Sequence, residues 1–255
     1  MKNWKSVMVL SASLLFAGVS SHPVLAQSPN ASVYVVHGIP GHDVNASLDP
    51  ALPVDVQVND SICLLKGFKF TEIAGPFTIP AGSYSFKISL ANTVAPCSNP
   101  ALLTANDVPF TEGENASVVA YLNAEGAPGV KKFDNDLTST PNGQSRLIVQ
   151  HTANAPAVDI KVGEDTFVIA RFPFTKTLAV VRDVTNGQQA AALLPSGELW
   201  NYPRTRVTLT PAGAIRPVIG PYFFQLVPHT AYLIYAVGSV STGSFTLIHK
   251  AIPGV

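Results

Sequence analysis

Short apolar segments separated by turn residues recur along the whole chain. They are rich in Val, Ile, Thr, Tyr and Phe, which favour β-strands, and Pro-Ala-Gly and Pro-Ser-Gly turns punctuate them. In the segment 83–90 the side chains of Tyr84, Phe86, Ile88 and Leu90 alternate with polar ones and share one face. No amphipathic helix of useful length is present. The pattern predicts strands at 31–37, 53–58, 83–90, 115–122, 145–151, 157–162, 204–210, 230–237 and 243–250.

The strand pattern occurs twice, in the same order. The matched blocks are 31–37 with 145–151, 53–58 with 157–162, 79–82 with 194–197, and 108–122 with 226–236. Each copy has about 110 residues and seven or so short strands, which is typical of an immunoglobulin-like sandwich. The sequence therefore predicts an all-β protein with β-sandwich domains at 27–133 and 145–255 and a polar linker at 134–144. The first copy carries an insertion at 41–50, and the second carries one at 198–203.

The N-terminal segment has the pattern of a signal peptide. Lys2 and Lys5 precede an apolar stretch at 7–19, and small residues at Val24 and Ala26 fit the positions that a signal peptidase inspects. The stretch is short for a membrane anchor, which is the competing interpretation. We expect residues 1–26 to be a signal peptide cleaved after Ala26. The mature chain would be secreted or periplasmic, with no membrane span.

The only two cysteines of the chain are Cys63 and Cys97, and export would place them in an oxidising compartment. An even number of cysteines in an oxidising compartment favours a disulfide. The alternative is a reactive or metal-binding pair, but the chain has no C-x-x-C motif and no histidine beside either cysteine. The sequence predicts one structural disulfide.

Charge is distributed unevenly between the two halves. Residues 27–140 carry 5 basic and 11 acidic residues, whereas 141–255 carry 9 and 5, so their net charges are near −6 and +4. The difference could favour docking of the halves, although salt screens it over about 8–10 Å. No dense basic stripe appears, and we expect no nucleic-acid partner.

Two segments of the chain resemble a known family. Val149-Gln-His151 followed by Ala155-Pro-Ala-Val-Asp159-Ile is similar to the VVHASPDAPAVDV element of the bacterial domain of unknown function 4397, and Pro80-Ala-Gly-Ser-Tyr84 resembles a turn typical of that family. The chain departs from the family at Thr152-Ala153 and through the insertion at 41–50. The resemblance implies exported, often tandem, β-rich modules and no particular reaction.

A histidine and an aspartate recur in both copies, as His37 with Asp55 and His151 with Asp159. If the two strands of each copy pair, each imidazole would lie beside a carboxylate and could form a metal half-site or an oriented general base. In the structural interpretation, which we favour, the aspartate accepts hydrogen bonds from the histidine or from turn amides and fixes the loop. Recognisable catalytic and metal-binding motifs are missing, and we expect no cofactor and no metal.

The insertion of the second copy contains Trp200, Tyr202 and Arg204. Aromatic faces on a rigid loop can stack on sugar rings, whereas the competing interpretation has Trp200 covering the sandwich core. These residues are our ligand-binding candidates. The sequence predicts an exported, non-enzymatic binding or surface-structural module whose partner is a cell-envelope glycan or envelope protein. The alternative is a metal-dependent or hydrolytic enzyme that uses the His/Asp pairs.

Overall fold

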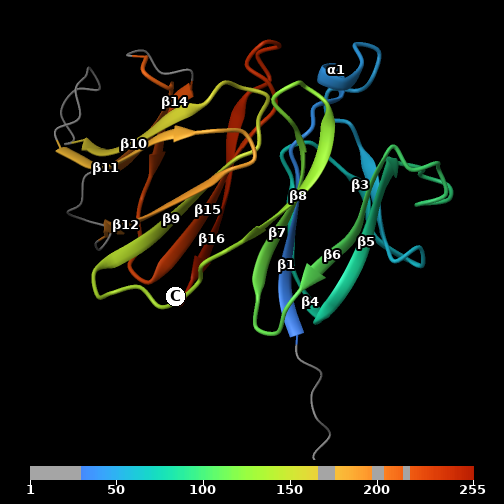
Figure 1. The fold of residues 1–255 in the computed structure, drawn as a ribbon, viewed down its shortest axis with the longest axis horizontal. Helices are drawn as coiled ribbons and strands as arrows, with labels where there is room; N and C mark the ends of the chain where they lie inside the picture. Colours follow the sequence, from blue (N-terminus) through green and yellow to red (C-terminus); the bar gives the residue numbers. More distant parts are fainter. Residues whose placement is uncertain (1–29, 166–175, 197–203, 215–218) are drawn as a thin grey trace, which may run out of the picture.

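A computed structural model describes residues 30–165, 176–196, 204–214 and 219–255. Apart from the four-residue helix α1, its regular elements are strands, which confirms the predicted all-β class with sandwich domains of immunoglobulin-like type (Figure 1). The first half contains β1 (Asn30–His37), α1 (Gly41–Val44), β2 (Val54–Val58), β3 (Ile62–Phe68), β4 (Ile73–Pro80), β5 (Gly82–Leu90), β6 (Leu103–Phe110), β7 (Asn115–Leu122) and β8 (Pro128–Asp134). The second half contains β9 (Gln144–His151), β10 (Val158–Asp165), β11 (Lys176–Val184), β12 (Gln189–Pro195), β13 (Arg204–Pro211), β14 (Ile219–Phe224), β15 (Thr230–Val237) and β16 (Thr246–Pro253).

Each half is a sandwich of two four-stranded sheets. In the first half the inner sheet has the order β4-β1-β7-β8 and the outer sheet the order β3-β2-β5-β6. The second half has an inner sheet β12-β9-β15-β16 and an outer sheet β11-β10-β13-β14, which is the same topology with every strand number raised by eight. The pairs β1/β7 and β9/β15 are parallel, and the other pairs are antiparallel.

Three hydrophobic cores hold these sheets together. A first core lies between the two sheets of the first half and includes Val33, Val56 and Val118. A second core fills the other sandwich in the same way, around Leu147 and Ile160. The side chains of successive residues in a strand point to opposite faces, so these residues use only one face of each inner sheet.

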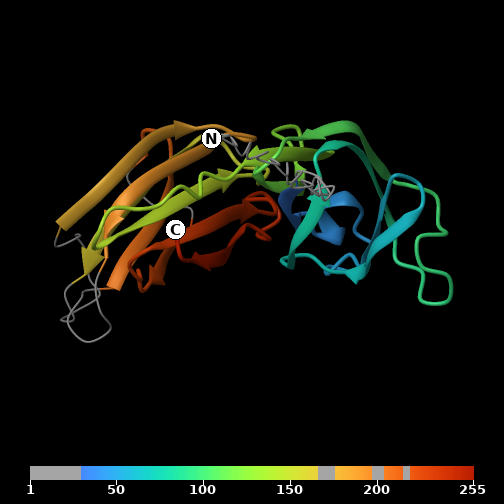
Figure 2. The ribbon, with the colours of Figure 1, turned by 90° about the horizontal axis from the view of Figure 1, so that it is seen from below.

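The other faces of the two inner sheets pack against each other and form a central core. Its fully buried members come from both halves and are Tyr34, Val36, Val119, Phe133, Ile148, Leu233, Tyr235 and Val237. The molecule is therefore a stack of four sheets with the inner sheets in the middle, as the side-by-side sandwiches in Figures 1 and 2 show. Among the described residues one ion pair joins residues 27–140 to 141–255, that of Arg146 with Asp136 at 3.2 Å, and its partners are close in the chain. Apolar packing rather than the charge difference therefore holds this interface.

A small polar network lies inside the central core. The Ser117 hydroxyl and the Tyr235 hydroxyl are 2.7 Å apart, and Gln150 Nε2 donates to Asn135 Oδ1 at 3.0 Å. Asn135 also bonds to Ser117. Each of these buried side chains thus has a partner on the other side of the interface, although the side-chain oxygen of Gln150 has none. Asn135 falls in the segment predicted as a polar linker, but it is only 7% exposed and joins the two halves.

Gly38 marks a place where the halves approach closely. A Cβ atom at this position would lie 2.8 Å from the Ala120 carbonyl oxygen and 2.9 Å from Val237 Cγ1. The Gly38 carbonyl also accepts a hydrogen bond from the Gly238 amide at 3.2 Å. Since Ala120 and Val237 belong to different halves, a glycine here allows the inner sheets to meet.

We predict that Gly38→Ala destabilises the folded protein by about 1–3 kcal/mol, the usual range for overpacking. Thermal or urea unfolding measures the loss. Val237→Ala removes one of the two obstructing groups, so the double variant should lose less stability than the sum of the two single variants. Additive losses, or an unchanged melting temperature in Gly38→Ala, would contradict the close approach of the halves.

Candidate functional site

The recurring His/Asp pairs do not form imidazole–carboxylate dyads. β1, which ends at His37, belongs to the inner sheet, whereas β2, which carries Asp55, belongs to the outer sheet. The strand pairing on which the dyad interpretation depends is therefore absent in the first half. The same holds for β9 with His151 and β10 with Asp159.

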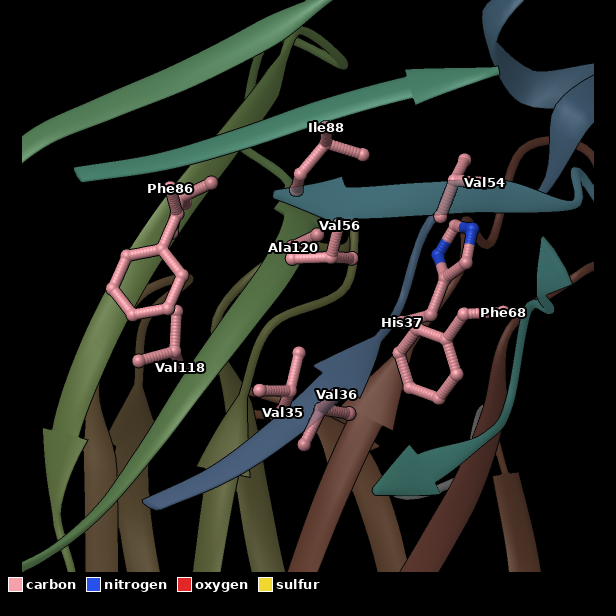
Figure 3. Close-up of a pocket in the computed structure, with 11 residues that line it drawn as sticks. Val35, Val36, His37, Val54, Val56, Phe68, Phe86, Ile88, Val118 and Ala120 are labelled. Carbon is pink, nitrogen blue, oxygen red and sulfur yellow. The ribbon is translucent and has the colours of Figure 1, made fainter. Parts of the chain in front are cut away.

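Both ring nitrogens of His37 form hydrogen bonds with backbone groups. Nε2 lies 2.9 Å from the Leu52 carbonyl oxygen and must donate to it, and Nδ1 accepts from the Ile39 amide at 3.3 Å. Both bonds are satisfied by one neutral tautomer. Figure 3 shows the ring pointing toward Val54 beside Phe68, and the adjoining apolar cavity, of about 10 Å³, is too small for a ligand. His37 ties the end of β1 to the insertion loop.

Burial lowers the pKa of His37 to about 4, although the bond to Leu52 and the charge of Glu72 act in the opposite direction. His151 repeats the arrangement in the second half. Its Nε2 donates to the Pro156 carbonyl oxygen at 3.1 Å, and burial lowers its pKa as well. Its Nδ1 is buried without a hydrogen-bond partner, and the residue is fully shielded from solvent. Both histidines are therefore neutral. Each fixes the loop that follows the first strand of its half.

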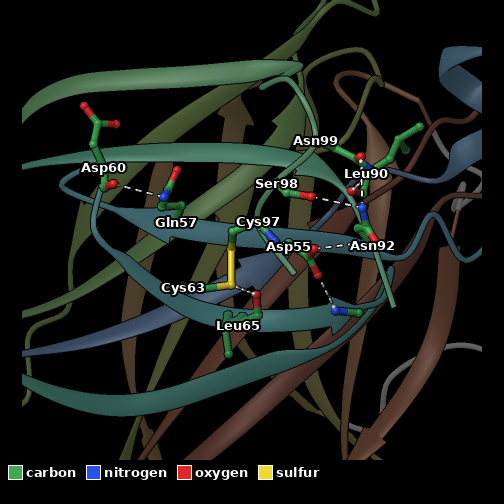
Figure 4. Close-up of a disulfide and its surroundings, with 11 residues drawn as sticks. Asp55, Gln57, Asp60, Cys63, Leu65, Leu90, Asn92, Cys97, Ser98 and Asn99 are labelled. Carbon is green, nitrogen blue, oxygen red and sulfur yellow. Dashed lines mark hydrogen bonds between the residues drawn. A yellow bond between two sulfur atoms is a disulfide. The ribbon is translucent and has the colours of Figure 1, made fainter. Parts of the chain in front are cut away.

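The aspartates bind backbone amides. Asp55 accepts from the amides of Gly67 at 2.9 Å, Asn92 at 3.0 Å and Cys97 at 2.8 Å (Figure 4). Burial alone would raise the pKa of Asp55, but these three bonds outweigh it and hold the pKa below its usual range. Asp159 accepts from the Asp183 amide at 3.1 Å and lies 3.8 Å from Arg182. Each aspartate binds an amide of the neighbouring edge strand where the strand register shifts, Gly67 on β3 or Asp183 on β11. Asp55 also anchors the β5–β6 loop.

The predicted disulfide is present. Cys63 on β3 and Cys97 in the β5–β6 loop are joined, with Cα atoms 5.8 Å apart (Figure 4). The same loop is held by Asp55 through Asn92 and Cys97. The disulfide and the aspartate together fix this long loop on the outer sheet.

The insertions of the two copies are described to different extents. Trp200 and Tyr202 lie outside the described residues, and of Arg204 only the backbone, at the start of β13, is described. The insertion at 41–50 lies against the second half, where Ser244 Oγ donates to Asp43 Oδ2 at 2.5 Å. This loop thus bridges the two sandwiches.

The described residues contain neither a candidate metal site nor a candidate membrane-spanning helix. Groups of three or more His, Cys, Asp or Glu side chains that could hold a metal ion are not found among them. Nor does that part of the chain contain a helix long and apolar enough to cross a membrane.

One feature that sequence reasoning missed is a cavity of about 440 Å³ at one edge of the first sandwich. It lies between β1 and β4 of the inner sheet and β2, β3 and β5 of the outer sheet. Its walls are mostly aliphatic and aromatic, with Ile62, Leu64, Phe77 and Ile79 among them. This volume falls within the range of small-molecule sites in proteins. The cavity is formed by strands that meet only in the folded sandwich, so no local motif signals it.

The lowered histidine pKa values predict an acid-sensitive fold. Between pH 6.5 and 4 the unfolded chain protonates His37 while the folded chain does not, so the free energy of unfolding falls as the pH falls through this window. The slope is at most about 1.4 kcal/mol per pH unit for each such histidine. Urea unfolding at several pH values measures it. The double variant His37→Gln/His151→Gln should be less stable at pH 7 but show a shallower slope; an unchanged slope would refute this assignment.

Removing the disulfide should weaken the first half. The bridge closes a loop with a sequence separation of 34 residues. The chain-entropy relation then predicts that Cys63→Ser/Cys97→Ser loses about 3–4 kcal/mol of stability. Chemical denaturation of both chains measures the difference. A double variant as stable as the wild type would show that Asp55 alone fixes the loop.

Comparison with known proteins finds no match among curated proteins. Among solved structures, the Bacillus anthracis TIE protein is 13% identical with a TM-score of 0.25, and the match covers 81% of this chain and 33% of the other. A Bacteroides uniformis protein described as "a putative cell adhesion protein" is 12% identical with a TM-score of 0.25, covering 89% of this chain and 99% of the other. The chain thus spans about a third of the Bacillus anthracis chain. Similarities at these TM-scores support no functional inference.

The family comparison agrees with the resemblance seen in the sequence. The family profile of Domain of unknown function (DUF4397) matches residues 31–161, which include all the strands of the first half and reach into β10. A second copy of the family domain in the remaining residues stays a prediction. The matched segment is more than half of the 255 residues, and the chain belongs to the DUF4397 family.

Proposed function

We propose that this protein is an exported, non-enzymatic binding module of two sandwich units, 27–133 and 145–255, connected by 134–144. The main support is that the histidine and the aspartate of each half form hydrogen bonds with backbone groups of that half. The residues best suited to chemistry thus already have structural roles. The disulfide supports folding in an oxidising compartment.

The enzymatic alternative gains no support from these residues. A general base or a metal ligand must offer a nitrogen lone pair to a substrate or an ion. In His37 one nitrogen is protonated and the lone pair of the other faces the Ile39 amide. The free nitrogen of His151 is buried in a residue with no solvent exposure.

The packing of the two halves supports a binding or surface-structural role. The central core and the bridge from Asp43 to Ser244 hold both sandwiches in one orientation. Loops at the ends of such a body are kept at fixed positions, which favours recognition. We propose a cell-envelope glycan or envelope protein as partner, with Trp200, Tyr202 and Arg204 as the glycan-contacting candidates.

Binding to insoluble glycans tests this function. We expect purified residues 27–255 to be retained saturably on one of peptidoglycan, cellulose or chitin. The Trp200→Ala/Tyr202→Ala variant should lose that retention while keeping the melting temperature of the wild type. Retention that survives the double substitution would place the site elsewhere, and no retention on any glycan would contradict glycan binding and leave an envelope protein as the partner.

A further inference from the structure

The cavity at the edge of the first sandwich exists because β3 and β4 stay apart. These strands are the neighbouring edges of the outer and inner sheets. In the second sandwich the corresponding strands, β11 and β12, contact each other, whereas no comparable contact joins β3 to β4. In the described part of the chain this edge is thus closer in the second half, whereas the edge of the first half is open.

Side-chain size explains this difference. Phe77 pairs with Val33 on β1, and its counterpart in the second half, paired with Leu147, is Ala192. Ile62 pairs with Val58, and the residue at the corresponding place, paired with Val162, is Ala179. Alanines allow two edge strands to approach, whereas larger side chains keep them apart.

Consequently the first half leaves apolar surface open to solvent. Ile62 is 56% exposed, and Phe77 and Ile79 are only partly buried, while Leu194, the counterpart of Ile79, is fully buried. Covering such surface is favourable by about 25 cal/mol per Å². The open edge is therefore a place where an apolar ligand gains free energy.

The polar groups of the cavity limit the class of ligand. No charged side chain lines it. The Tyr84 hydroxyl donates to the Pro80 carbonyl at 2.8 Å, and Asn59 Oδ1 accepts from the Ser85 amide at 2.9 Å. The side-chain NH₂ of Asn59 and the hydroxyl of Thr78 are the donors of the lining that can serve a ligand. The nearby ammonium of Lys87 is already paired with Asp60 at 2.6 Å, so a buried carboxylate would lack a counter-charge.

We propose that this cavity binds an aliphatic acyl chain in neutral form, as an ester or amide whose carbonyl accepts from Asn59. The inference rests on the proposed function as a binding module and gives it a second, non-glycan site. The same chemistry is offered by a bilayer lipid and by a diffusible acyl ester, so the test includes both sources.

Calorimetric titration of residues 27–255 with monomeric monododecanoylglycerol tests the proposal. We expect saturable 1:1 binding, and weaker binding of dodecanoate at pH 8. Ile62→Asp places a charge at the mouth and should weaken binding at least about tenfold, as loss of one buried aliphatic contact implies. Leu64→Trp fills the cavity and should abolish binding. Because Ile62 is largely exposed, its variant should keep the wild-type melting temperature.

Leu193→Asp is the matched control, because Leu193 is an aliphatic residue, 46% exposed, on the closed edge of the second sandwich. It should bind like the wild type. No binding by the wild type, or equal weakening in the Ile62 and Leu193 variants, would overturn the proposal. Binding to phosphatidylcholine vesicles that Ile62→Asp abolishes would support the site and identify a bilayer source, and binding of the monomeric ester alone would support a diffusible one. Glycan retention, measured on the same chains, separates failure of this site from failure of the proposed function.

Discussion

The architecture depends on burying both faces of the two inner sheets. Their middle strands, β1, β7, β9 and β15, are buried on both faces. One face packs in its own sandwich and the other in the central core, which is largely apolar but holds polar side chains such as Ser117 and Gln150. A sheet with two apolar faces is stable in water only when both are covered. Each half covers the second face of the other, and full burial of a single Leu or Tyr side chain contributes about 1.5–3 kcal/mol. The glycine at 38, the buried amide of Asn135 and the bridging insertion loop all follow from this contact.

The path of the chain between the two sheets explains why residues typical of active sites have structural roles in both halves. The chain leaves the inner sheet after β1 or β9 and must enter the outer sheet at β2 or β10. A buried histidine donates to a carbonyl on this path, and the aspartate on β2 or β10 accepts from an amide of the neighbouring edge strand, Gly67 or Asp183. Backbone groups in such crossovers have no strand partner, so side chains satisfy them. The pair recurs because the crossover recurs.

The sequence predicted the middle strands of all four sheets and missed nearly every edge strand. β2, β5, β10 and β13 alternate apolar and polar residues, and the middle strands of the inner sheets contain runs of apolar residues, so both kinds are recognisable in the sequence. Edge strands are different, since they carry Pro and Gly, as in β4, or charged and amide residues, as in β6. The repeat and the disulfide could also be recognised, because both are patterns along the chain. Sheet assignment could not, which is why the sequence left open a His/Asp dyad that the two separate sheets do not form. The cavity depends on the spacing of two edge strands, and the interface depends on which surfaces meet; neither leaves a local signal.

Amide hydrogen exchange of Leu233→Ala, compared with the wild type, is the most direct test of the central core. Leu233 lies in β15 of the second half and is fully buried against the inner sheet of the first. If the two inner sheets form one cooperative unit, the truncation should accelerate exchange in β1 and β7 as well as in β9 and β15. Faster exchange confined to the second half, with β1 and β7 unchanged, would show that the sandwiches are independent and would contradict the account.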